Sequence, residues 1–262
     1  MEILIKEIKL KNKKNPLKIV PVGDIHFGNK NCNISLLKRT LQYINDTEDC
    51  YMIGMGDYVE AILAQDHRFE QDNHPFAVQD QMYQIMEWFR PLAEKGKILG
   101  LLTGNHEEKV RKMTSWDLTN VMCSNLNVPY LGYSAFIRLS ISHKQVHGYP
   151  FIIYATHGVS SAGKAGSTLN RLLTMGEKFD ADILMMGHTH KIIDYPQVKI
   201  SLAKTKLVKR IQHFINTGSF LETYINGTIS YAERAQYQPL ETGTIELKLY
   251  PATKQIVSRK LT

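Results

Sequence analysis

The chain has 262 residues, of which 43% are hydrophobic and 22% are charged, and its formal net charge is +7. These proportions are ordinary for a soluble globular protein, and the longest apolar runs are far shorter than the roughly 20 residues that span a bilayer. The N-terminal stretch interleaves Glu and Lys with apolar residues, so it lacks the core of a signal peptide. No membrane contact is therefore expected.

The excess of basic residues favours partners that carry phosphate, because clustered Lys and Arg raise the local concentration of anions. Solvated lysine-rich surface is an equally good interpretation of the charge alone. The three cysteines, Cys32, Cys50 and Cys123, are scattered and form no C-x-x-C pair. This pattern indicates reduced thiols in a cytoplasmic protein rather than a disulfide framework. The sequence does not determine the oligomeric state, so a homo-oligomer is left open.

Short apolar runs that end in Gly, Asp, Asn or His recur along the chain and predict buried strands. After a first, partly alternating strand at Ile3–Leu10, these runs are Leu17–Val22, Tyr51–Met55, Ile98–Thr103, Phe151–Thr156, Ile183–Met186 and Phe214–Thr217. Helices with one apolar face are predicted at Ile34–Asn45, Gln79–Phe89 and Ser167–Phe179. The chain then ends in predicted paired strands at Ile229–Tyr231, Thr244–Tyr250 and Gln255–Arg259. The alternation predicts one α/β domain over residues 1–262, with a polar surface loop at Ala64–Phe76.

The residues that follow the apolar runs share one kind of chemistry. They are carboxylate, amide and imidazole groups without a thiolate: Asp24, His26, Asp57, Asn105, His106, His157, His188 and His190. Such a set suits Mn, Fe, Zn and similar divalent ions better than Ca, and ligands gather at the carboxyl ends of strands in open α/β sheets. The D-x-H and H-x-H pairs have a spacing of two, which in extended backbone points both members to one side. The sequence therefore predicts a metal site.

The motifs, taken in order, resemble the calcineurin-like metallophosphoesterase superfamily over about residues 19 to 220. They are D-x-H (Asp24, His26), GD (Gly56, Asp57), GNHE (Gly104 to Glu107), HG (His157, Gly158) and GHTH (Gly187 to His190). The segment NTGS, Asn216–Ser219, is similar to the family's NPGS turn, with Thr217 in place of proline. Each motif alone is weak, but their order after successive apolar runs is specific. The resemblance implies a four-layer α/β/β/α sandwich with two mixed sheets and a dinuclear metal site at the C-terminal ends of the strands.

The resemblance also implies two divalent ions as cofactors. Mn is the favoured metal, and Fe, Zn, Ni and Co are the alternatives. One ion would be held by Asp24, His26 and His190, the other by Asn105, His157 and His188, and Asp57 would bridge the two. Ions about 3.5–4 Å apart can share a water as hydroxide, which attacks phosphorus in line.

His106 is not a ligand in this scheme. It would contact phosphate or protonate the leaving oxygen. Glu60 and Glu107 are candidates for orienting ligand histidines, and solvated surface is an equally good interpretation of both. The basic side chains expected to contact substrate are Lys109, Arg111 and Lys164, with Arg171 a further candidate; solvated surface is an equally good interpretation of Lys164 and Arg171.

The implied activity is phosphoester hydrolysis. The basic charge and the cluster after GNHE favour a phosphodiester, with nucleic acid or a nucleotide as the candidate substrate. A phosphomonoesterase and a nucleotide pyrophosphatase are the alternatives. A non-catalytic scaffold of the same fold is less favoured, because the chain retains the full ligand set and His106.

Residues Gly158 to Lys164 also fit G-x-x-x-x-G-K, the start of a nucleotide-binding loop. That loop requires Ser or Thr after the lysine, whereas Ala165 stands there. The partner strand should end in Asp, yet Asp182 precedes its predicted strand. The segment from Gly158 to Asn170 is therefore interpreted as a lid or substrate-contact loop.

Overall fold

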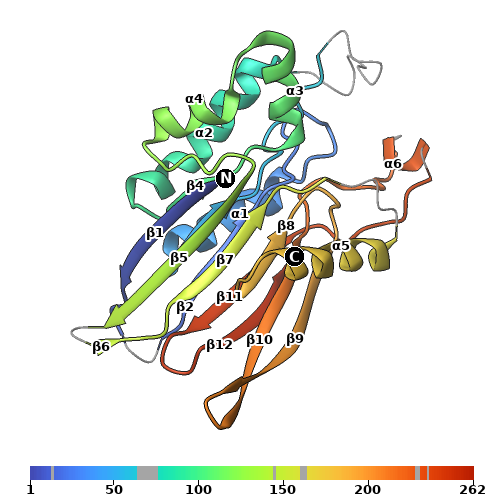
Figure 1. Ribbon diagram of the computed structural model, residues 1–262. Helices are drawn as coiled ribbons and strands as arrows, with labels where there is room; N and C mark the ends of the chain where they lie inside the picture. The colour runs from blue at the N-terminus through green and yellow to red at the C-terminus, as the bar shows by residue number, and fades with distance from the viewer. Residues whose placement is uncertain (13–14, 64–75, 144–145, 160–163, 228–230, 235) are drawn as a thin grey trace.

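The structure is a computed structural model that describes residues 1–12, 15–63, 76–143, 146–159, 164–227, 231–234 and 236–262. Within these residues, two mixed sheets lie face to face (Figure 1). The first has the strand order β1-β5-β7-β8-β10-β9, with β6 paired to β5. Its strands are β1 Glu2–Lys9, β5 Ser134–His143, β6 Val146–His147, β7 Phe151–Thr156, β8 Ile183–Met186, β9 Ile192–Ala203 and β10 Lys206–Thr217.

The second sheet has the order β12-β11-β2-β3-β4. Its strands are β2 Leu17–Val22, β3 Cys50–Gly54, β4 Ile98–Leu101, β11 Thr244–Tyr250 and β12 Gln255–Leu261. β2, β3 and β4 are parallel, as are β7, β8 and β10 in the first sheet. The loops after these parallel strands carry the polar motifs.

Helices cover the outer face of each sheet. The helices are α1 Ile34–Asp46, α2 Val78–Glu94, α3 Asn105–Thr114, α4 Leu118–Leu126, α5 Ala165–Lys178 and α6 Tyr231–Arg234. The apolar faces of α1, α2 and α4 pack on the second sheet through residues such as Val20. Leu172 of α5 packs on the first sheet against Phe214.

Alternation along β2 places Ile19 on its other face, in the core between the sheets with Ile215 of β10. The observed layers are the four-layer α/β/β/α sandwich that the resemblance implies.

The strands predicted from continuous apolar runs are confirmed, and most of their ends differ by a few residues. β10 is the exception, because it begins at Lys206, eight residues before the predicted start at Phe214. β5 and β9 were not predicted, because their apolar residues alternate with polar or exposed ones, and α3 and α4 were also missed. The predicted strand Ile229–Tyr231 is wrong at Tyr231, which begins α6, while 229–230 lie outside the described residues.

Residues 64–75 of the predicted surface loop also lie outside the described part of the chain. Among the described residues, no helix combines the length and the hydropathy needed to cross a membrane.

Candidate metal centre

The predicted metal residues all lie just beyond a strand or at the start of a helix. They come from the loop after β2 (Asp24, His26), the loop after β3 (Asp57), the first residue of α3 (Asn105), the end of β7 (His157) and the loop after β8 (His188, His190). Both sheets therefore contribute. The fold brings the seven side chains together although they span 167 positions of the chain, from 24 to 190.

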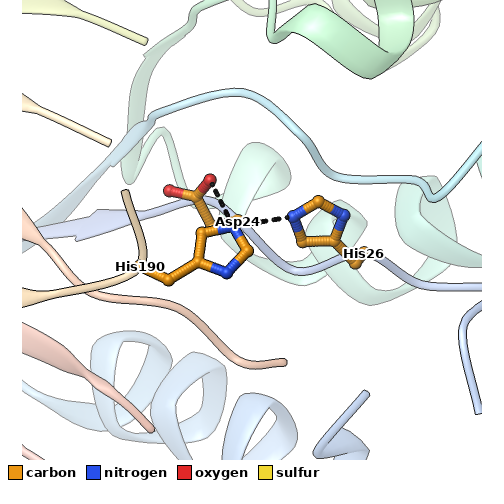
Figure 2. A group of neighbouring side chains, drawn as sticks. All are labelled: Asp24, His26 and His190. Carbon is orange, nitrogen blue, oxygen red and sulfur yellow. Dashed lines mark hydrogen bonds and ion pairs between the residues drawn. The ribbon is translucent and has the colours of Figure 1, made fainter. Parts of the chain in front are cut away.

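One group consists of Asp24, His26 and His190, whose donor atoms lie within 4.8 Å of one another (Figure 2). The two histidine Nε2 atoms are 3.1 Å apart, and Nε2 of His190 is 3.4 Å from Oδ1 of Asp24. Asp24 is fully buried. Its carboxylate accepts the backbone N–H of His188, at 2.9 Å to Oδ2, which fixes the loop after β8 against the loop after β2.

The second group consists of Asp57, His157 and His188. Nε2 of His157 lies 3.2 Å from Oδ2 of Asp57 and 3.0 Å from Oδ1 of Asn105. The rings of His157 and His188 meet edge to face, with centroids 5.2 Å apart. Asn105, exposed at the start of α3, completes the set at the solvent side.

The donor set in both groups fits a cation. Nδ1 of His157 donates to the carbonyl of Met55 at 2.8 Å, which fixes the proton on Nδ1. Its Nε2 lone pair then faces only oxygen acceptors, those of Asp57 and Asn105. Likewise, Nδ1 of His26 donates to Glu60 at 2.8 Å, so its Nε2 lone pair faces another imidazole. Converging lone pairs need a proton or a metal ion between them, because buried acceptors without a donor are costly.

The electrostatics of the metal-free site agree with this requirement. Burial alone would raise the pKa of Asp57, but His157 and His106 hold that pKa well below its ordinary value. Burial would lower the pKa of His157, yet the Asp57 carboxylate raises it to about 10. Without a metal ion, the site thus binds protons where a divalent ion would otherwise neutralise the carboxylates.

The backbone at these residues is not extended, which corrects the geometric reason given for the paired spacing. Left-handed φ values occur at Asp24 (48°), His26 (52°), Asp57 (50°), His188 (67°) and His190 (58°). Non-glycine residues rarely adopt this conformation, and strained residues of this kind concentrate at functional sites. Each strand ends in a tight turn that directs the side chain into the centre.

Glu60 orients two histidines, as predicted. Its Oε2 lies 2.8 Å from Nδ1 of His26, and its backbone carbonyl accepts a hydrogen bond from Nδ1 of His106. The rings of His26 and His106 are perpendicular, with centroids 4.7 Å apart. Glu60 therefore holds the two imidazoles in one arrangement.

Glu107 does not orient a histidine, so that expectation is wrong. Its buried carboxylate accepts four backbone N–H groups instead: Oε2 from Asp57 (3.0 Å) and Gly104 (2.9 Å), and Oε1 from Tyr58 (2.8 Å) and Val59 (3.2 Å). Burial raises the pKa of Glu107 to about 7, while these amides favour its ionised form. Glu107 acts on the site through the backbone of the loop that carries Asp57.

The basic residues predicted to contact substrate lie on α3 or directly before α5. Lys109 and Arg111 are on α3, which begins at Asn105, and Lys164 is the exposed residue that precedes α5. Arg111 donates to Glu108 through Nε and Nη2 at 2.7 and 2.9 Å. Residues 160–163 of the proposed lid lie outside the described residues.

Two supports of the centre were not predicted as such. Asn216 donates from Nδ2 to the carbonyls of Met186 and Gly187, at 3.0 and 3.1 Å. Ser219 donates to the carbonyl of Asp24 at 2.8 Å. Both belong to the NTGS segment, which was the available signal in the sequence. The backbone carbonyl of Met55, which accepts the hydrogen bond from His157, could not be predicted from the sequence, because every residue has a backbone carbonyl.

The comparison with solved structures finds chains that are similar to this protein along most of their length. The protein is similar to Vps29 of Entamoeba histolytica complexed with zinc, at 14% identity, covering 94% of this chain and 99% of that one, with a TM-score of 0.45. It is also similar to a metallophosphoesterase from Sphaerobacter thermophilus, at 13% identity, covering 95% and 89%, with a TM-score of 0.42. A search of curated proteins finds no match.

Residues 17–192 match the family described as calcineurin-like phosphoesterase. The matched region starts with β2 and ends two residues after His190, so it contains both groups of candidate metal ligands described above. The match covers more than half of the chain, which therefore belongs to the calcineurin-like phosphoesterase family.

Proposed function

We propose that this protein hydrolyses phosphoesters with two divalent metal ions bound at the candidate centre. One observation carries the proposal: two clusters of carboxylate and imidazole donors lie side by side, with Asp57 between them. Nε2 of His157 is 3.2 Å from Oδ2 of Asp57 on one side, and Nε2 of His26 is 3.9 Å from the same oxygen on the other. A carboxylate in this position suits a bridge between two ions.

The ligand assignment follows the two clusters. Asp24, His26 and His190 would hold one ion, Asn105, His157 and His188 would hold the other, and the Asp57 carboxylate would be shared. When bound, two such ions activate water and neutralise charge on the phosphate oxygens. The imidazoles and carboxylates together suit Mn, with Fe, Zn, Ni or Co as alternatives.

His106 acts as the proton donor to the leaving oxygen. Burial lowers its pKa, but the charges of Asp57 and Glu60 outweigh burial, and the pKa is raised overall. A raised pKa favours the protonated imidazole, the form that a general acid requires. The hydrogen bond from Nδ1 to the Glu60 carbonyl leaves Nε2 as the atom that delivers the proton.

A phosphodiester is the favoured substrate class. The formal charge of +7 favours polyanions, and the second turn of α3, the helix that begins at Asn105, carries both Lys109 and Arg111. These residues and Lys164 are proposed to contact phosphates flanking the scissile bond, as a nucleic acid or nucleotide would present them. Phosphomonoesters and nucleotide pyrophosphates are the alternative substrates.

The test compares bis-p-nitrophenyl phosphate with p-nitrophenyl phosphate, using purified protein stripped with EDTA and then given Mn²⁺. Turnover that depends on metal and prefers the diester is expected. His106→Ala should reduce kcat by about 10²–10⁴-fold while the bound metal, measured by elemental analysis, is unchanged. Asp57→Asn should remove both turnover and metal.

Each alternative has a distinct result. Preference for the monoester would support the phosphomonoesterase. Two bound metals without turnover of mono-, di- or pyrophosphate esters would contradict the enzymatic proposal and support a scaffold. For nucleic acid, the cleavage rate of single-stranded DNA should fall steeply with salt, because contacts to phosphates release counterions.

A further inference from the structure

The strands β9 and β10 form a hairpin whose outer half continues past the rest of the first sheet (Figure 1). β8 pairs with β10 only from His213 to Asn216, so residues 206–212 have β9 as their neighbour in the ladder. We call residues 197–212 the arm. The two residues Lys204 and Thr205 close it, with Lys204 at a φ of 55°.

The two faces of the arm differ in chemistry. Residues paired across the antiparallel ladder share a face. Leu202 pairs with Leu207, Ile200 with Lys209, and Val198 with Ile211 on one face, while Ser201 pairs with Val208 and Lys199 with Arg210 on the other. The first face exposes five aliphatic side chains: Val198 (56%), Ile200 (61%), Leu202 (72%), Leu207 (72%) and Ile211 (51%).

This apolar face is the continuation of the side of the sheet that faces the core. Ile215 of β10 lies on the same face by the alternation of the strand, and it is buried between the two sheets. Phe214, on the opposite face, packs with Leu172 of α5. On this face, the aliphatic side chains of β10 therefore continue from the part that is buried between the sheets into the exposed arm. A sheet face of this type normally packs on a second sheet.

The base of the arm is anchored on both sides. Nδ1 of His213 lies 3.0 Å from Oδ1 of Asp194, whose other oxygen accepts a hydrogen bond from Ser258 of β12. On the outer face, Arg210 donates to Asp180 at 2.6 Å and to Asp182 at 3.1 Å. Because these contacts already order the arm, its association with a partner has a smaller entropic cost.

We propose that the apolar face of the arm packs on the same face of a second copy of this chain, forming a two-fold dimer. A two-fold axis brings identical patches together, so one apolar face supplies both sides of the interface. The five aliphatic side chains expose on the order of 500 Å² per chain, near the upper end for a monomer. Two copies would bury about 1,000 Å², the lower bound for a specific interface.

The position of the charges favours a protein face over a bilayer as the occupant. The apolar side chains run along the arm from Val198 to Leu202, whereas the tip carries Lys204 and Lys206. A tip that entered a bilayer would have to bury these ammonium groups first, at a cost of several kcal/mol. In a dimer of arms, the lysines at the tips remain in water.

The proposal is tested by sedimentation equilibrium of the full chain with the variants Leu207→Glu and Val208→Glu. The two residues are adjacent in β10 and differ in the face they occupy, so Val208→Glu is the matched control. The wild type and Val208→Glu should be dimers. Leu207→Glu should raise the dimer dissociation constant by at least ~100-fold, because the charge enters the interface twice. Ile200→Glu should have the same effect on the dimer. Its carboxylate would lie opposite Lys209 in the ladder, so the hairpin itself would gain a favourable pair of opposite charges.

The far-UV circular dichroism of every variant should match the wild type, since the altered side chains are exposed in one chain. A wild type that is monomeric at about 100 µM would overturn the proposal, because the interface would then be too weak to matter. Equal effects of Leu207→Glu and Val208→Glu would also overturn it. So would a monomer whose binding to phosphatidylserine vesicles is lost in Leu207→Glu, which would assign the face to a lipid surface.

Discussion

Replacement of Glu107 by glutamine tests whether this carboxylate holds the backbone of the metal centre. Each of its two oxygens accepts two backbone N–H groups, at distances between 2.8 and 3.2 Å. Glutamine keeps one oxygen and replaces the other by an NH₂ group, so either orientation of the amide leaves two buried N–H donors facing a donor. A buried group that loses its partner costs about 1–3 kcal/mol.

The expected loss for Glu107→Gln is therefore about 3 kcal/mol in the free energy of unfolding. Glu107→Ala leaves all four donors without the carboxylate and should cost about 5 kcal/mol or more, which is comparable with the whole stability of many domains. The assay is urea unfolding followed by tryptophan fluorescence, in EDTA so that metal binding does not contribute.

Glu108→Gln is the matched control, because Glu108 is the next residue of α3 and its partners Arg111, Lys112 and Tyr133 are all exposed. Removal of such a surface ion pair should cost at most about 1 kcal/mol. Glu107→Gln and Glu108→Gln with equal unfolding free energies would refute the reasoning, because Glu107 would then contribute no more than a surface charge.

Two further predictions concern packing and burial. A Cβ added at Gly104 would overlap the backbone nitrogen and Oδ1 of Asp57, so Gly104→Ala should lower the melting temperature and the amount of bound Mn²⁺. Gly166→Ala in α5, where a Cβ has open space, should stabilise by about 0.5–1 kcal/mol; similar effects of the two changes would contradict the packing argument. Burial raises the pKa of Cys32, Cys50 and Cys123 to about 12, so the native thiols should react with Ellman's reagent at pH 8 far more slowly than the unfolded chain. The unfolded thiols ionise near pH 8.5, so the unfolded chain binds fewer protons between that pH and 12, and stability should fall as pH rises through this range. Rapid native reaction of all three thiols would show that they are accessible.

The strands that position the site were predictable because they are buried on both faces. β3 and β8 are therefore continuous runs of apolar residues, and β2 is interrupted only by Lys18, so the polar motifs stand out where those runs end. β5 has one face covered less completely, so its apolar residues alternate with Arg138 and serines and the run is interrupted. In β9 the apolar and the basic residues are both exposed, so a search for buried apolar runs does not identify this strand.

The motifs predicted which polar residues the fold brings together, but they did not predict the backbone conformation of those residues. A spacing of two residues fits extended backbone and also fits the left-handed turns that Asp24 and His26 adopt. The role of Glu107 was wrong for a related reason. Three of its four partners are backbone amides about 50 positions away. A sequence does not reveal such a partner, because nearly every residue has a backbone amide.

The distances within the centre depend on how the two sheets pack. Asp24, His26 and Asp57 follow strands of the second sheet, whereas His157, His188 and His190 follow strands of the first. Both metal-binding clusters combine residues from the two sides. The apolar core between the sheets, rather than any local motif, therefore sets the separation of the carboxylates from the imidazoles. A change of volume in that core, far from the polar residues, should alter metal affinity even where each loop keeps its own hydrogen bonds.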